Sequence, residues 1–364
     1  MSNLVLTRRY PNGLFEVTLN RAAALNALNL DMVKQIDAAL ATASDDDQIA
    51  AVVITSSSEK AFCAGGDVRQ ICQQVQSGDP KELKLAHEFF ELEYALDLNI
   101  RNFKKPLITL AQGYVMGGGM GLFCASEFSV ACGNVTMAMP EILIGLFTDV
   151  GASKFLGNSA LSRFAALTGC HLKSAAIKAL SLATHQTESS ATEVLSKLSE
   201  FNLGSTEDQA RVRIDELLMG LEREVYSDSD VEEISALEFG EDFGSCVETI
   251  LKLTQHESKW ISSSAMNLKF GSPQSAALNW LTQCWAADKT FDEVYALDLI
   301  NVKAQIQRPD FIEGVRARLI DKDLSAKWQS AMTDPINQIL PTICPFDDQW
   351  NDLCLSQGIR LKQS

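Results

Sequence analysis

The stretch PLITLAQGYVMGGGMGLF, residues 106–123, joins an apolar β-branched run to three glycines and then to a second apolar run. This order predicts a buried strand over 106–113 that turns at Gly117-Gly118-Gly119 into a helix. A second glycine loop, Ala64-Gly65-Gly66-Asp67, follows another β-branched run at 51–57. Strands that alternate with helices, with glycine loops at the strand ends, indicate an α/β fold with a buried sheet.

The flanking segments extend this plan in both directions. Residues 4–8 and 14–19 are predicted as strands of a hairpin that turns at Pro11-Asn12-Gly13. Apolar residues recur at helical spacing from Ala24 to Ala43, and Asn29 is a suitable start signal for that helix.

Further elements follow along the chain. A long helix is expected after Pro80, to about Phe103, and short strands are expected at 127–132 and 135–140. Segment 145–153, GLFTDVGAS, leads into another helix. After about residue 185 helical patterns dominate, so we predict a core over 1–190 and a mainly helical region over 191–364.

Composition and charge exclude several classes of protein. The chain has 364 residues and a net charge of -16, and such a surface repels phosphate backbones, so nucleic acid is not an expected partner. An acidic stretch from Glu207 to Asp242 is predicted to be a solvated helical face and loop. No apolar run reaches the roughly 20 residues of a membrane-spanning helix, and residues 1–10 lack the apolar core of a secretory signal. We therefore expect a cytoplasmic protein without a membrane partner.

The cysteines and histidines do not suggest a metal. Nine cysteines without a CxxC pair and four scattered histidines form no pattern of metal ligands. Cys63 lies beside a glycine loop, where a small buried packing residue is a better interpretation than a nucleophile. We expect no metal site.

The two glycine loops suit a reaction that develops negative charge on a carbonyl oxygen. Backbone N–H groups can stabilise such charge where glycine lets the main chain come close, and the start of a helix adds its dipole. Gly117-Gly118-Gly119 and Ala64-Gly65-Gly66 both have this context. The alternative is that either run serves only tight turning and close helix–sheet packing.

Three acidic residues are candidates for chemistry. Glu141 follows Pro140 and Asp149 follows the apolar segment 142–147, and carboxylates in apolar surroundings tend to have raised pKa values. Glu93 has apolar neighbours at helical spacing. Each has a structural alternative: an exposed or salt-bridged turn for Glu141, a helix cap for Asp149 and a boundary residue reaching for solvent for Glu93.

Several of these segments together resemble the crotonase (enoyl-CoA hydratase/isomerase) superfamily, and within it the 3-hydroxyisobutyryl-CoA hydrolases. The last of the matching segments, residues 310–328, is typical of the hydrolase branch and absent from ordinary hydratases. The matching segments are LNRAAALNALN (19–29), KAFCAGGDVR (60–69), residues 113–122, AMPEILIGLFTDVGAS (138–153), SPQS (272–275) and DFIEGVRARLIDKDLSAKW (310–328).

The resemblance implies a crotonase-like spiral of ββα units and a role for each candidate. Gly66 and Gly118 match the backbone donors of the family's oxyanion hole. Glu141 matches its essential glutamate, and Asp149 matches the aspartate that distinguishes the hydrolase branch. Glu93 matches a glutamate that contacts substrate. Gly118, Glu141 and Asp149 are also implied to contact substrate.

Four positions differ from the patterns of the wider superfamily or of the hydrolase branch. The second catalytic glutamate of hydratases falls here on Gly121, which weakens a hydratase assignment. The usual Pro-Lys after LNR is Ala22-Ala23, so the lysine that helps hold the nucleotide of CoA is missing. Thr148 stands where the branch usually has proline, which leaves Asp149 in place.

The implied activity is hydrolysis of a short 3-hydroxyacyl-CoA thioester, with 3-hydroxyisobutyryl-CoA as the implied substrate and valine breakdown as the pathway. CoA is part of the substrate, and no separate cofactor is implied. The family often forms trimers or dimers of trimers, so the resemblance implies a possible homo-oligomer, although the C-terminal region could cover the usual contact face. Two alternatives remain: an enoyl-CoA hydratase or isomerase, and a non-catalytic acyl-CoA-binding protein.

Overall fold

The computed structural model describes residues 3–225, 227–240, 242–340 and 347–358. Contacts between Cα atoms divide the chain into two compact units, each built from three separate segments. Unit 1 comprises Met1–Asp67, Glu91–Met137 and Lys173–Tyr226, and unit 2 comprises Val68–Phe90, Ala138–Leu172 and Ser227–Ser364. The domain boundary expected near residue 190 stays a prediction.

Among the described residues, unit 1 is built on one seven-stranded sheet. Six strands follow the order β1-β2-β3-β5-β6-β7, and the seventh, β4, pairs with β5. The first two strands form the predicted antiparallel hairpin, whereas β2–β3, β3–β5, β4–β5 and β6–β7 pair in parallel. The predicted α/β class is confirmed. The strands are β1 Val5–Arg9, β2 Leu14–Leu19, β3 Ala51–Ser56, β4 Ala61–Cys63, β5 Leu107–Met116, β6 Phe128–Ala138 and β7 His185–Thr187.

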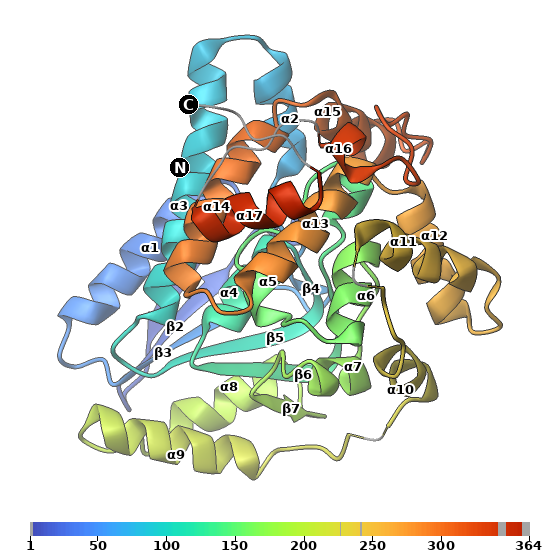
Figure 1. Ribbon diagram of the computed structural model, residues 1–364. Helices are drawn as coiled ribbons and strands as arrows, with labels where there is room; N and C mark the ends of the chain where they lie inside the picture. The colour runs from blue at the N-terminus through green and yellow to red at the C-terminus, as the bar shows by residue number, and fades with distance from the viewer. Residues whose placement is uncertain (1–2, 226, 241, 341–346, 359–364) are drawn as a thin grey trace. The chain divides into compact units, whose positions relative to one another are not determined.

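One face of this sheet is covered by α8 and α9 (Figure 1). Alternate residues of β3 and β5, such as Val53 and Ile108, point to that face, as the two-residue period of a strand requires. They pack against Val194 and Leu198 of α8 and Ile214 of α9, all fully buried. Complete burial of one such side chain contributes about 1.5–3 kcal/mol.

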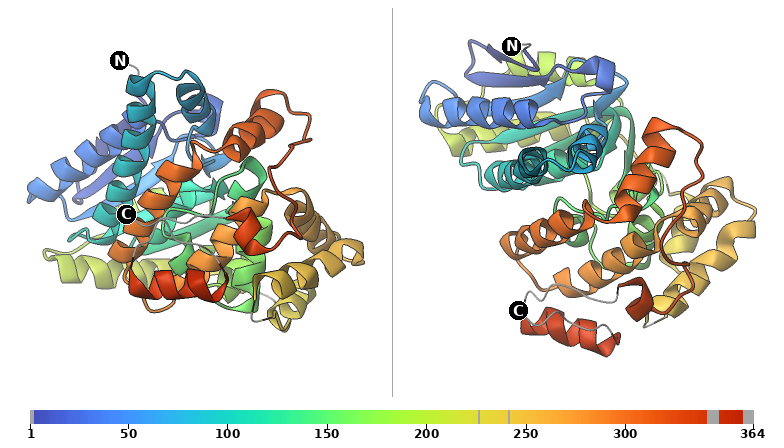
Figure 2. Two further views of the ribbon diagram at one scale, coloured as in Figure 1. Left: turned by 45° about the horizontal axis from the view of Figure 1, so that its top comes forward. Right: turned by 90° about the horizontal axis from the view of Figure 1, so that it is seen from above.

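The other helices of unit 1 include α1 and the second half of α3, which lie side by side (Figure 2). Asn99 of α3 donates a hydrogen bond of 3.0 Å to the Asp37 carboxylate of α1. The helices of this unit are the 3-10 turn η1 Ala22–Ala24, α1 Leu30–Asp45, the residues of α3 Pro80–Arg101 from Glu91 onward, α4 Gly118–Ala125, α7 Ser174–Ala179, α8 Ala191–Glu200 and α9 Glu207–Met219.

The start of α1 and the extent of β6 test two of the local predictions. Asn29 caps α1 as expected, because its side chain accepts the Met32 N–H, so the helix begins at Leu30 rather than Ala24. The two short strands expected over 127–140 are wrong: one continuous strand, β6, runs from Phe128 to Ala138. Gly133 has a positive φ of 56° within it, and the strand continues past that irregular residue.

Unit 2 is helical, which confirms the helical character predicted for the C-terminal part of the chain. Long helices such as α13 and α14 pack with the short elements around residues 141–168. The elements are α2 Val68–Gln76, the first half of α3, η2 Glu141–Ile144, α5 Ala152–Phe155, α6 Ala160–Thr168, α10 Ser229–Ser235, α11 Phe243–Lys252, η3 Leu253–Gln255, α12 Lys259–Phe270, α13 Pro273–Ala286, α14 Phe291–Gln305, α15 Pro309–Val315, the π-helical turn η4 Arg316–Ile320, α16 Ile336–Ile339 and α17 Asp348–Ser356.

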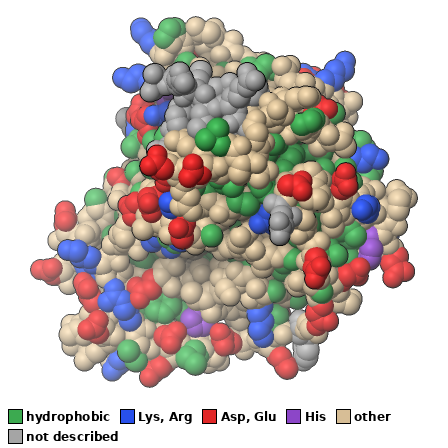
Figure 3. Space-filling model, viewed as in Figure 1, with side chains coloured by type: hydrophobic (Ala, Val, Ile, Leu, Met, Phe, Trp, Pro, Cys, Tyr) green, Lys and Arg blue, Asp and Glu red, His purple; other side chains and the backbone are tan. Residues whose placement is uncertain are grey.

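The acidic stretch from Glu207 to Asp242 contains α9 and α10 with loop segments between them, as predicted. Acidic side chains are dispersed among basic ones on the face in view rather than gathered in one patch (Figure 3). Within the described part of the chain, no helix is both long enough and apolar enough to cross a membrane.

Candidate functional site

The first group of candidate residues lies in unit 1, where the two glycine loops approach each other. Gly65 has a φ of +99°, and a Cβ on it would lie 3.3 Å from the Met116 carbonyl oxygen and 3.8 Å from the Gly118 nitrogen. The loops that follow β4 and β5 are therefore in close contact. Their adjacency follows from the parallel pairing of these two strands, which brings the carboxyl ends of both to one edge.

Each loop contains a backbone N–H group that does not bond within its own strand pairing or helix: that of Gly66 in the first loop and that of Gly118 in the second. On either side of Gly66, the Gly65 carbonyl accepts the Leu28 N–H at 2.8 Å and the Asp67 N–H donates to the Leu28 carbonyl at 2.7 Å. Because successive residues of an extended chain face opposite sides, the Gly66 N–H points away from Leu28. Gly118 is the first residue of α4, and the first N–H groups of a helix have no partner within the helix.

Glu93 places a buried carboxyl group against the second loop. It lies on α3 with only 2% of its surface exposed. The alternative interpretation, in which Glu93 reaches for solvent at the boundary of the helix, is therefore wrong. A Cβ on Gly118 would lie 2.1 Å from the Glu93 Oε1 atom. Glycine is thus the residue that fits beside this carboxylate.

Cys63 lies beside the same loops and is an inert packing residue. Its side chain is fully buried, and burial raises the pKa of the thiol to about 12, with smaller contributions from the negative charges of Glu93 and Asp97. A thiol with such a pKa is not the nucleophile at neutral pH. A Cβ on Gly119 would come within 2.5 Å of the Cys63 carbonyl, so close packing also requires that glycine.

The second group lies in unit 2 and begins at Glu141, the first residue of η2. Its side chain is 6% exposed, and its Oε2 atom has no hydrogen-bond partner among the described residues. Burial raises the pKa of this carboxyl well above its ordinary value of 4.5, and the negative charge of Asp149 raises it further. An exposed turn is therefore excluded.

Asp149 is also buried, at 4% exposure, and lies close enough to act on the charge of Glu141. Asp149 is not the N-cap considered as its alternative, because the N-cap of α5 is Gly151. Two carboxyl groups that share one buried environment cannot both ionise easily. Such a pair can divide the roles of base and proton donor.

The turn that begins at Glu141 is held by residues 310–314. A Cβ on Gly145 would lie 2.2 Å from the Asp310 carbonyl oxygen, and one on Gly314 would lie 2.3 Å from the Ile144 carbonyl carbon. The buried Asp310 side chain accepts from the Ser272 hydroxyl at 3.0 Å and from the Gln329 N–H at 2.9 Å. Segment 310–314 therefore packs directly on the end of η2.

The Asp149 turn is held by two side chains that the sequence did not single out. The Thr148 N–H donates to the Asn279 Oδ1 atom at 2.8 Å, and the Gly151 N–H donates to the Asp298 Oδ2 atom at 2.9 Å. Proline, the residue that the family resemblance implies as usual at position 148, has no N–H to make the first bond. Asp298 was detectable as an acidic residue in the apolar run YALDLI of α14.

The candidate residues thus form two sets. Gly66, Gly118 and Glu93 are associated through the two loops of unit 1. Glu141 and Asp149 are both buried in unit 2, and the negative charge of Asp149 acts on Glu141. Their individual roles in catalysis stay predictions.

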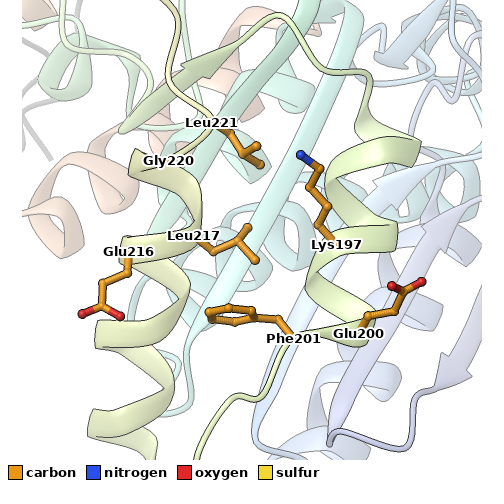
Figure 4. Close-up of a pocket in the computed structure, with 7 residues that line it drawn as sticks. All are labelled: Lys197, Glu200, Phe201, Glu216, Leu217, Gly220 and Leu221. Atoms are coloured by element: carbon orange, nitrogen blue, oxygen red, sulfur yellow. The ribbon is translucent and has the colours of Figure 1, made fainter.

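A separate surface groove of about 480 Å³ lies between α8 and α9 and contains none of these candidates. Figure 4 shows Phe201, Leu217 and Leu221 lining its interior, while the carboxylates of Glu200 and Glu216 point away from it. It has no pair of carboxyl groups arranged for acid–base chemistry.

Comparison with known proteins extends over most of the chain. A family model described as enoyl-CoA hydratase/isomerase matches residues 14–339. The "3-hydroxyisobutyryl-CoA hydrolase, mitochondrial" of Danio rerio is 34% identical over 348 residues, which cover 93% of this chain and 86% of that protein. The Homo sapiens protein of the same name is 35% identical over 323 residues, with coverages of 86% and 81%.

A solved structure is similar over nearly the whole chain. The crystal structure of an enoyl-CoA hydratase from Rhodobacter sphaeroides 2.4.1 matches with a TM-score of 0.77 and 26% identity, covering 92% of this chain and 96% of that one. A carnitinyl-CoA dehydratase from Mycobacterium thermoresistibile matches with a TM-score of 0.75 at 24% identity, covering 91% and 99%, and supports the fold alone.

Proposed function

The chain belongs to the enoyl-CoA hydratase/isomerase family, and we propose from this premise that it hydrolyses a short 3-hydroxyacyl-CoA thioester. The proposed substrate is 3-hydroxyisobutyryl-CoA, which would give 3-hydroxyisobutyrate and CoA in valine catabolism. The vertebrate relatives carry this activity in their names, and their similarity covers more than four fifths of both chains.

The observation that carries this proposal is the pair of buried, electrostatically interacting carboxyl groups of Glu141 and Asp149. Burial and the negative charge of Asp149 hold the pKa of Glu141 well above its ordinary value, which suits a group that takes up and releases protons during a reaction. Asp149 of this pair stands where the resemblance implies the aspartate that distinguishes the hydrolase branch. Gly121, at the place of the second hydratase glutamate, favours hydrolysis over hydration.

The proposed roles follow the resemblance residue by residue. The N–H groups of Gly66 and Gly118 form an oxyanion hole for the thioester oxygen, and Glu93 holds the hydroxyl of the acyl group. Loss of one oxyanion donor typically costs about 2.7–4 kcal/mol of transition-state stabilisation. Asp149 orients the substrate hydroxyl or the attacking water.

Glu141 acts by one of two routes. As a general base, it takes a proton from water while the water oxygen attacks the carbonyl carbon. As a nucleophile, it attacks that carbon itself, and water then cleaves the resulting anhydride and restores the carboxylate. In both routes the C–S bond breaks, and CoA leaves as its thiolate or is protonated as it departs. A single turnover in ¹⁸O-water that labels the Glu141 carboxyl identifies the anhydride route.

The test compares two substrates for release of free thiol and for hydration. Incubation with 3-hydroxyisobutyryl-CoA should release CoA thiol rapidly, whereas crotonyl-CoA should be neither hydrated nor cleaved at a comparable rate. Hydration of crotonyl-CoA without thiol release would instead support an enoyl-CoA hydratase. Tight binding of both thioesters without turnover would support a non-catalytic acyl-CoA-binding protein.

The partners, cofactor, location and assembly of the protein are also part of this proposal. We infer an acyl-CoA as the partner, no nucleic acid or membrane, and no cofactor beyond the CoA of the substrate. A cytoplasmic location is the sequence-based proposal, although the names of the vertebrate relatives include the word mitochondrial. Assembly as a homo-oligomer is proposed from the family resemblance.

A further inference from the structure

The turn that follows Asp149 has an unusual backbone. Val150 and Gly151 are both left-handed, with φ values of 51° and 77°. This region is disfavoured for residues with a Cβ, and most of all for a β-branched residue such as valine. A backbone of this kind persists only where the surrounding structure holds it.

Two buried side-chain acceptors hold this turn, one on each side of Asp149. Asn279 of α13 accepts the Thr148 N–H at 2.8 Å, and Asp298 of α14 accepts the Gly151 N–H at 2.9 Å. Asn279 is fully buried, and Asp298 is 1% exposed. The Asn279 Nδ2 atom donates to the Ala166 carbonyl at 2.7 Å, which fixes its oxygen toward Thr148.

The α14 helix also packs against the turn. Phe291, Tyr295 and Asp298 lie at helical spacing on one face of α14. A Cβ on Gly151 would lie 3.2 Å from the Tyr295 ring and hydroxyl and 3.4 Å from the Phe291 ring. The turn therefore has contacts on α14 beyond the hydrogen bond to Asp298.

We propose that Asp298 and Asn279 are positioning residues for Asp149. By accepting the N–H groups on either side of it, they fix the left-handed turn and thereby the direction of the Asp149 carboxylate. Neither residue touches the reacting atoms in this role. The inference rests on the role proposed above for Asp149.

The test uses variants of Asp298 that separate hydrogen bonding from packing. Asp298→Asn keeps an acceptor for the Gly151 N–H, whereas Asp298→Leu keeps the branched shape with larger methyl groups and has no acceptor. Asn279→Leu removes the second acceptor. Asn301→Leu, which changes a buried polar residue one turn further along α14, is the matched control, and Asp149→Asn tests the premise.

The assay measures kcat and KM for CoA release from 3-hydroxyisobutyryl-CoA by full-length variants whose circular dichroism matches the parent. We expect Asp298→Leu and Asn279→Leu to lower kcat about 10- to 100-fold with little change in KM, since a misplacement of about 1 Å can cost 100-fold. Asp298→Asn should stay within about 3-fold of the parent, and so should Asn301→Leu, because neither removes an acceptor from the turn. If Asp298→Leu does not fold, Asn279→Leu carries the same test.

Three results would overturn the inference. The first is a folded Asp298→Leu with parental kcat. The second is equal loss in Asn301→Leu, which would reduce the effect to packing. The third is an Asp298→Asn variant as slow as Asp298→Leu, which would assign the effect to the carboxylate itself. Parental activity of Asp149→Asn would instead refute the proposed role of Asp149, and absence of thiol release by the parent would refute the proposed function.

Discussion

Replacing Gly118 by alanine tests whether the glycine loop of β5 is needed for its shape beside Glu93. The added Cβ would lie 2.1 Å from the Glu93 Oε1 atom, whereas the shortest ordinary contact is 3.4 Å. Either the loop or the carboxylate must therefore move by about 1.3 Å. Glu93 is 2% exposed, so its side chain has little room to swing away.

The expected consequence is a large loss of turnover. A displacement of about 1 Å in a catalytic constellation can lower the rate about 100-fold. That factor corresponds to about 2.7 kcal/mol of transition-state stabilisation. The assay is release of CoA thiol from 3-hydroxyisobutyryl-CoA, with circular dichroism to establish that the variant is folded.

A control and a double mutant make this prediction specific. Gly220→Ala is the matched control, because a Cβ there would have ordinary contacts of 3.4 Å or more, and it should retain full activity. If Gly118→Ala acts through the contact with Glu93, adding it to Glu93→Ala should cost little more than Glu93→Ala alone. Full activity of Gly118→Ala, or strictly additive losses in the double mutant, would refute the reasoning.

The other predictions concern the buried carboxyl groups and the close packing around them. Because burial raises the pKa of Glu141, the folded state binds its proton more tightly than the unfolded state, and stability is lost as pH rises from the ordinary 4.5 through the raised pKa. Glu141→Gln should therefore leave Tm near the parental value at pH 4 and raise it at pH 8; an equal shift at both would contradict this account. Asp149→Asn removes a negative charge that raises the pKa of Glu141, so the acid limb of kcat against pH should move to lower pH, and movement to higher pH would count against the coupling. Gly145→Ala combines a left-handed φ of 72° with a Cβ only 2.2 Å from the Asp310 carbonyl oxygen, and it should lower the free energy of unfolding by about 2 kcal/mol or more. Gly78→Ala, with φ of 69° and open space around it, should cost clearly less in the same urea titration, and equal costs would show that the contact is unimportant.

Much of the fold was predictable because its signals are local. The hairpin turn at Pro11-Asn12-Gly13, the Asn29 cap and the β-branched runs at 51–57 and 106–113 each depend on residues near in sequence. The extent of β6 was not predictable in this way, because the length of a strand depends on the strands that it pairs with, here β5 and β7.

For the candidate site, the sequence by itself determined which residues have the right chemistry: the glycine loops, Glu93, Glu141 and Asp149. It left a structural alternative open for each carboxylate, since burial depends on residues far away along the chain.

Only the tertiary structure decided these alternatives. It buries Glu141 beside Asp149, and it brings Asn279 and Asp298 from distant helices to the Asp149 turn, 131 and 147 positions away from their partners. Such contacts leave no period or motif in the sequence, because a single hydrogen bond between distant segments requires only one suitable side chain at one point of a helix.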